Sequence, residues 1–181
     1  MGIIASNEFE EPWMDEGINS FFEQRIMDHY WGEKSGMIDH PVLMVSDKAL
    51  GRISYVQSPY RSLVSNNEFS WNYPLGTYAM MSYQKTAAWL QTMMGIIGEE
   101  TINDIFREYY RRWAFRHPAG KDFINVVNDV VKKNHGDKFG PDMNWFFDQV
   151  LYGTGVCDYG VAEFENIKYE KANGDFEDAD T

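Results

Sequence analysis

Cysteine and long apolar runs are both scarce in this sequence. Its 181 residues include one cysteine, Cys157, which excludes an internal disulfide and any C-x-x-C zinc or redox motif. No run of 18 apolar residues occurs, so the sequence predicts no membrane-spanning helix. These features leave the cellular compartment open.

Basic residues are also few. There are 16 Lys and Arg against 28 Asp and Glu, a net charge of −12. Because a nucleic-acid surface needs a basic face, this balance argues against nucleic acid as a partner. Much of the acidic excess lies in residues 163–181, where seven acids face two lysines. We expect residues 174–181 to form a solvated, mobile tail.

Several catalytic motifs are missing. The sequence has no H-E-x-x-H, no G-x-S-x-G and no phosphate-binding G-x-x-x-x-G-K, so nucleophilic catalysis is not expected. The four histidines are scattered, and none pairs with another at a spacing of four. His117, directly before Pro118, is typical of a turn rather than of a metal ligand.

What the sequence does contain is a strong helical pattern. With 44% apolar and 16% aromatic residues, it is long enough to bury one substantial core. The fold class is therefore mainly α, with a short β segment predicted by the alternation in residues 156–169. Apolar spacing, prolines and glycines predict helices over residues 12–31, 74–97, 99–116, 122–134 and 143–151, with one or two short helices around 48–56 inside a long connection, 33–73.

The first predicted helix carries a polar face. Glu16, Ser20 and Glu23 are spaced by four and three residues, so they lie on one side of it. On an unknown helix such a face is most often simply solvated. A single glutamate cannot hold zinc tightly, because a zinc site needs several ligands and groups that orient them.

The same segment resembles a family signature. Trp13-Met14-Asp15-Glu16-Gly17-Ile18-Asn19-Ser20-Phe21-Phe22-Glu23 is similar to the W-[LM]-[ND]-E-G-[FI]-x-x-[FY]-x-E signature of the gluzincin metallopeptidases, specifically the aminopeptidase N family. The resemblance implies that Glu16 is a zinc ligand. It also implies that Asp15 and Glu23 shape the site.

A second segment resembles another motif of that family. Tyr83-Gln84-Lys85 follows Glu16 by 67 residues and is similar to the family's Y-x-K-G motif. The resemblance implies that the Tyr83 hydroxyl stabilises the oxyanion formed during peptide hydrolysis, and that Tyr78 and Lys85 line the site. Thr86 departs from the usual glycine, which implies a different backbone approach there. Without the resemblance, Tyr83 would be interpreted as an ordinary core tyrosine.

A third segment, residues 144–155, resembles the W-F-F-x-Q-W-L-x-x-x-G stretch that ends the helical part of the family's catalytic domain. The resemblance therefore extends over almost the whole chain. It implies that residues 1–155 are the helical subdomain of a thermolysin-like zinc-peptidase domain. Residues 156–181 would begin a following β segment and then form the acidic tail.

The family takes two more zinc ligands and its general base from an H-E-x-x-H helix that precedes the signature. We expect that helix upstream of Met1, so that this chain is part of a zinc peptidase acting on peptides. The 181 residues alone would then bind zinc weakly and be inactive, and the face left exposed could drive self-association. A G-x-M-E-N segment is also absent, so aminopeptidase and endopeptidase activity both remain open.

Two other interpretations fit the same residues. One is a non-catalytic helical interaction or scaffold module, derived from the peptidase fold without its catalytic helix. The other is an unrelated helical bundle that matches the motifs by chance.

Overall fold

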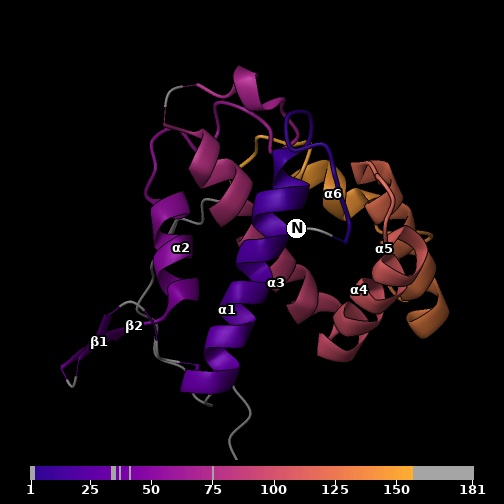
Figure 1. Ribbon diagram of the computed structural model, residues 1–181, viewed down its shortest axis with the longest axis horizontal. Coiled ribbons are helices and arrows are strands. Elements are labelled where there is room, and N and C mark those ends of the chain that lie inside the picture. The colour runs from indigo at the N-terminus through magenta and orange to yellow at the C-terminus, as the bar shows by residue number, and fades with distance from the viewer. Residues whose placement is uncertain (1–2, 34–35, 37, 41, 75, 157–181) are drawn as a thin grey trace, which may run out of the picture.

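The computed structural model describes residues 3–33, 36, 38–40, 42–74 and 76–156, and this part of the chain is mainly helical (Figure 1). No helix in these residues is long and apolar enough to span a membrane. The elements in chain order are a π-helical turn η1 (Trp13–Gly17), α1 (Ile18–Trp31), β1 (Ile38–His40), β2 (Leu43–Val45), α2 (Asp47–Val56), the 3₁₀ turn η2 (Ser70–Asn72), a π-helical turn η3 (Met80–Lys85), α3 (Thr86–Ile97), α4 (Glu99–Trp113), α5 (Gly120–His135) and α6 (Asn144–Val150).

The predicted helices are confirmed, with ends set by local capping. Gly98, with φ of 88°, separates α3 from α4, a backbone angle that glycine adopts without strain. The Ser46 hydroxyl accepts a hydrogen bond from the Ala49 N–H at 3.2 Å and starts α2. Helix α4 ends at Trp113, so Arg116 lies outside the helix in which it was predicted.

The connection between α1 and α2 holds a hairpin that the sequence did not predict. β1 and β2 pair antiparallel, with Ile38 opposite Val45 and His40 opposite Leu43, and project beyond α1 and α2 in Figure 1. Three residues per strand give too short an alternation to recognise. The strand predicted from residues 156–169 and the acidic tail fall on residues 157–181, outside the described part.

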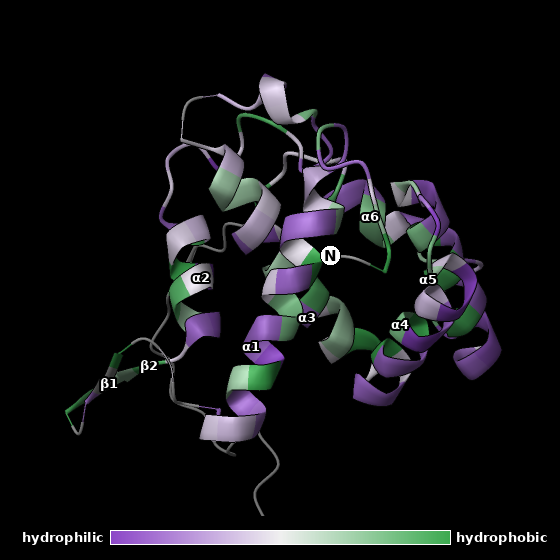
Figure 2. Cartoon of the chain, in the orientation of Figure 1, coloured by the Kyte–Doolittle hydropathy of each residue, from purple (hydrophilic) through white to green (hydrophobic). Residues whose placement is uncertain are grey.

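The core is built on aromatic side chains from η1, α3, α5 and α6. Trp13 is fully buried, with its ring 5.7 Å from that of Trp89 and 6.0 Å from that of Phe123. Trp89 in turn packs edge-on against Phe147 at 5.9 Å. Helices α4 and α5 show both hydrophilic and hydrophobic stretches in Figure 2, as expected for helices with one buried side. Trp13 thus joins the start of the chain to its later helices.

Glu11 makes a second link between these parts. Its carboxylate accepts a hydrogen bond from the backbone N–H of Gly120 at 2.8 Å, at the start of α5. This satisfies an N–H that has no partner within the helix, and it places negative charge at the positive end of the helix dipole. Burial raises the pKa of the Glu11 carboxyl. The bond holds η1 against α5.

Helix η1 crosses η3 at a glycine. A Cβ atom on Gly17 would lie 2.2 Å from Cβ of Thr86 and 2.6 Å from the carbonyl oxygen of Ser82. Only a residue without a side chain fits this contact. Thr86, where the family motif has glycine, fills the space against Gly17.

A buried asparagine supports the η3 side of this crossing. Asn66 is fully buried. Its Nδ2 donates to the Met81 carbonyl at 3.0 Å, and its Oδ1 accepts from Thr86 Oγ1 at 3.2 Å and Trp89 Nε1 at 3.0 Å. Its own N–H donates to the Leu151 carbonyl at 2.9 Å. Because each of these polar groups has a partner, Asn66 can be buried at little net cost.

Gly17→Ala tests the crossing. We expect the added methyl group to force η1 and η3 apart and to lower the free energy of unfolding by about 1–3 kcal/mol, the usual range for overpacking. Urea unfolding measures this change. Gly95→Ala in α3 is the matched control, because nothing lies within 4 Å of the added atom there, and it should be stabilising by up to about 1 kcal/mol. Equal effects of the two substitutions would contradict the close contact.

Candidate functional site

The structure brings Glu16 and Tyr83 together across the crossing of η1 and η3. Glu16 lies directly before Gly17, the contact residue of η1, and Tyr83 directly after Ser82, whose carbonyl faces that glycine. Both side chains are partly buried. The pKa of Tyr83 is raised well above its ordinary value, first by a side-chain hydrogen bond with the Glu16 carboxylate and then by burial. Tyr83 therefore keeps its proton and can act as a hydrogen-bond donor.

Asp15 and Tyr78 lie beside this pair. The Tyr78 ring is 6.5 Å from the Tyr83 ring. Burial raises the pKa of Tyr78, and Glu16, Glu8 and Asp15 raise it further. Burial also raises the pKa of Asp15, followed by the charges of Glu16 and Glu8. The carboxylates of Glu16 and Asp15 raise the pKa of both tyrosines, so the site carries negative charge that a cation would offset.

Glu8 also belongs to the site, although the sequence did not indicate it. It lies outside the signature segment, before the helix begins, and nothing in its spacing relates it to Glu16. Its proximity to Asp15 and Tyr78 depends on how the chain enters η1.

Glu23 lies apart from the pair. It is exposed on α1, about two turns beyond Glu16, and is not among the groups that raise the pKa of Tyr83. Ser20, on the same predicted polar face, is buried at 8% exposure. That face is therefore not uniformly solvated. Part of it packs inside the domain.

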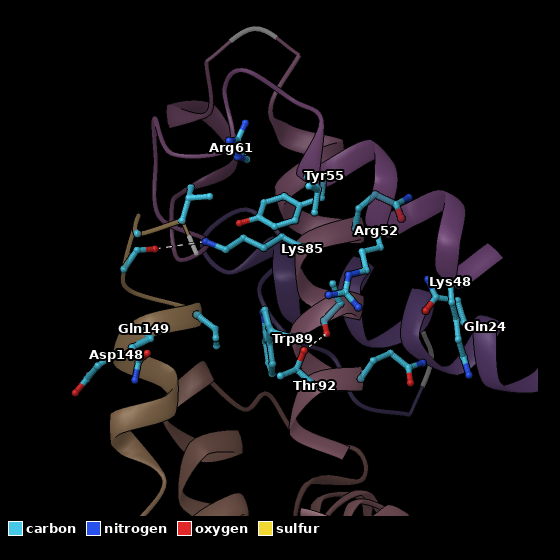
Figure 3. A pocket seen from close by; sticks show the side chains of 18 residues that line it. Gln24, Lys48, Arg52, Tyr55, Arg61, Lys85, Trp89, Thr92, Asp148 and Gln149 are labelled. Carbon is cyan, nitrogen blue, oxygen red and sulfur yellow. Dashed lines mark hydrogen bonds between the residues drawn. The ribbon is translucent and has the colours of Figure 1, made fainter. Parts of the chain in front are cut away.

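Lys85 points into a different space from Tyr83. Its side chain is only 6% exposed, and Nζ donates to the Gly153 carbonyl at 3.4 Å (Figure 3). Burial lowers the pKa of Lys85 from 10.5 to about 8. Residues two apart on a helix do not share a face, so Lys85 and Tyr83 point to different sides of η3.

The carboxylates alone do not form a metal centre. Within the described ranges, no group of three His, Cys, Asp or Glu side chains converges closely enough to hold a metal ion. The negative charge around Glu16 suits a cation, but a zinc site needs three protein ligands. These residues therefore fit zinc only as part of a larger ligand set.

The resemblance of the motifs that carry Glu16 and Tyr83 implies a metallopeptidase catalytic domain. Comparison with protein families gives the same class: the family described as Peptidase family M1 domain matches residues 2–153. The chain belongs to this family, and its resemblance to the aminopeptidase N-like gluzincins is confirmed. Neither the curated proteins nor the solved structures contain a match.

Lys85→Met tests the burial of this ammonium group. At pH 7 the charged group is desolvated, so we expect the substitution to raise the free energy of unfolding by about 1–3 kcal/mol. Between pH 8 and 10.5 the unfolded chain binds more protons than the folded one, so the wild type gains stability as pH rises and the difference shrinks.

The measurement is urea unfolding at pH 7 and pH 10 in a buffer free of polyvalent anions. Lys133→Met, at an exposed position on α5, serves as the control and should change stability by less than about 0.5 kcal/mol at either pH. If Lys85→Met changes the free energy of unfolding equally at pH 7 and pH 10, the buried charge of Lys85 does not destabilise the fold, and the expectation is wrong.

Proposed function

We propose that this domain supplies one zinc ligand and the oxyanion donor of a zinc peptidase that hydrolyses peptides, with Glu16 as the ligand and Tyr83 as the donor. The observation that carries the proposal is the pairing of these two side chains across η1 and η3. Chance motif matches at a separation of 67 residues have no reason to fold into contact.

The geometry suits the role of Tyr83. A donor helps catalysis when it is held in place before charge develops on the substrate oxygen. The backbone of Tyr83 is fixed by the packed η3 turn, and the neighbouring carboxylate keeps its hydroxyl protonated. Its hydroxyl would donate to the oxygen of the scissile carbonyl as the tetrahedral intermediate forms.

Glu16 would act as one of three protein ligands. Zinc, when bound, polarises a carbonyl and activates water for attack. The other two ligands and the general base would come from an H-E-x-x-H helix outside these 181 residues. Without that helix we expect the chain to bind zinc weakly and to be inactive. Asp15 and Tyr78 would tune the charge around Glu16.

The scaffold alternative depends on the same missing helix. Reading the coding sequence in frame upstream of Met1 separates the two: an H-E-x-x-H segment there supports the peptidase, and its absence supports a non-catalytic module. Aminopeptidase rather than endopeptidase activity rests on the family resemblance, and comparing a peptide with a free amino terminus against its acetylated form tests it.

Glu16→Gln and Tyr83→Phe test the two roles in the polypeptide that joins this domain to an H-E-x-x-H helix. Tyr83→Phe should lower kcat about 100- to 1000-fold, the usual effect of removing an oxyanion donor, with zinc content unchanged. Glu16→Gln should lose both bound zinc and activity. Peptide hydrolysis and the metal content of purified protein are the measurements.

Tyr110→Phe, at an exposed position on α4, is the matched control and should leave kcat and zinc unchanged. The proposal fails if Tyr83→Phe retains full kcat, or if Glu16→Gln retains tight stoichiometric zinc. Tight zinc bound through Glu16 by the 181 residues alone would contradict the incomplete ligand set.

Self-association is a further part of the proposal. An aromatic patch of Phe9, Phe69 and Trp71 lies close to the site. Phe69 and Trp71 stack with centroids 4.9 Å apart, and Trp71 is 64% exposed. The Ser70 N–H donates to the Phe9 carbonyl at 2.8 Å, which holds the patch next to Glu8. Exposed apolar patches tend to be covered by a partner surface.

We therefore expect the isolated chain to form dimers at high protein concentration, and Trp71→Ser to weaken them. Sedimentation equilibrium measures the association constant. Phe115→Ser is the control, since Phe115 is more exposed, at 81%, but lies in the turn after α4. A strict monomer at every concentration, or equal effects of the two substitutions, would rule this surface out.

A further inference from the structure

A cavity of about 1030 Å³ lies between α2, the η3–α3 helix and the end of α6 (Figure 3). It is lined by Lys85 and Gln84 but not by Tyr83 or Glu16, so it is separate from the candidate peptidase site. Its volume is at the upper end of the range found for small-molecule sites.

The lining is strongly cationic in a chain whose net charge is −12. It carries four basic side chains, Lys48, Arg52, Arg61 and Lys85, and one acidic side chain, Asp148. Asp148 lies on the opposite side of the view from Lys48 and Arg52 (Figure 3). Lys48 is paired with Asp28, whereas Arg52 makes no hydrogen bond or ion pair with any residue in the described part.

Buried donors in this lining also lack acceptors. Arg61 Nε and Gln91 Nε2 are both buried and have no hydrogen-bond partner among the described residues. Lys85 is only 6% exposed. Its ammonium group has three donors, yet it makes one hydrogen bond, to the Gly153 carbonyl at 3.4 Å. Buried polar groups are nearly always satisfied, so unpaired donors on residues that line one cavity point to a missing acceptor.

We propose that this cavity binds a ligand bearing two or more oxyanion groups, carboxylate or phosphate, through Arg61, Lys85 and Arg52. The planar, forked donors of a guanidinium group match the oxygens of carboxylate and phosphate, and an ammonium group supplies a point charge. Trp89 and Val56 add apolar surface beside the charges. This proposal does not rest on the peptidase function.

Two sources of such groups are available. One is a free polyvalent anion. The other is the chain itself, because Val156 lines the cavity and the sequence that follows it carries seven acids in residues 163–181. Both would present several oxyanions to the same side chains.

The experiment is a calorimetric titration of the full chain with inorganic pyrophosphate at low ionic strength. We expect one site per chain, weakened at least about tenfold by Arg61→Gln and by Lys85→Met, because each removes a charge-assisted hydrogen bond. Lys85→Met is expected to fold stably, so its weaker binding cannot be assigned to unfolding. Arg116→Gln and Lys133→Met, both at exposed positions away from the cavity, should bind like the wild type.

A second protein separates the two sources. In it, the seven acids of residues 163–181 are replaced by their amides. If this protein binds pyrophosphate at least about tenfold more tightly than the wild type, and the difference persists at a salt concentration that screens long-range repulsion, the chain's own acidic segment occupies the cavity. If both bind equally, the ligand is a free anion. If neither binds, or if Arg61→Gln and Lys85→Met bind as well as the controls, the proposal is overturned.

Discussion

The close approach of η1 and η3 at Gly17 determines where Glu16 and Tyr83 lie. A side chain at position 17 would overlap both Thr86 and the Ser82 carbonyl, so the two helices meet backbone to backbone. The residues next to this contact are then held at a short, fixed separation. Glu16 precedes Gly17 and Tyr83 follows Ser82, and the crossing therefore places the Glu16 carboxylate where it raises the pKa of Tyr83.

Both elements at the crossing are π-helical turns, which are uncommon and often occur at functional sites. Such a turn holds an extra residue and alters which side chains face the neighbouring helix. Asn66 supports the η3 turn by donating to the Met81 carbonyl and accepting from Thr86. The long connection, residues 33–73, therefore has a structural role at this point: the buried amide of Asn66 holds the backbone that presents Tyr83.

The helices could be predicted because they depend on local signals: apolar spacing, and Gly32 and Gly98 at helix ends. The pairing of Glu16 with Tyr83 was expected only from the resemblance of two short motifs to a family. The hairpin of β1 and β2 could not be predicted, since three-residue strands carry almost no periodicity. The role of Asn66 could not be predicted either, because the partners of its side chain are 15 to 23 residues away. The direction of Lys85 also depends on three-dimensional packing, because the motif that contains it gives its position in the chain and not the face it occupies.

Helix η3 separates regions of opposite charge. On one side Tyr83 meets carboxylates, and on the other Lys85 faces a cavity lined by arginines. Only Gln84 separates the two residues in the chain, so the two regions are little more than half a helical turn apart along η3. A cation at Glu16 and an anion beside Lys85 would each offset a local excess of charge that the folded chain otherwise leaves uncompensated. Because both regions share the backbone of η3, a substitution that shifts this turn should disturb both, whereas a change to one side chain should affect only its own side.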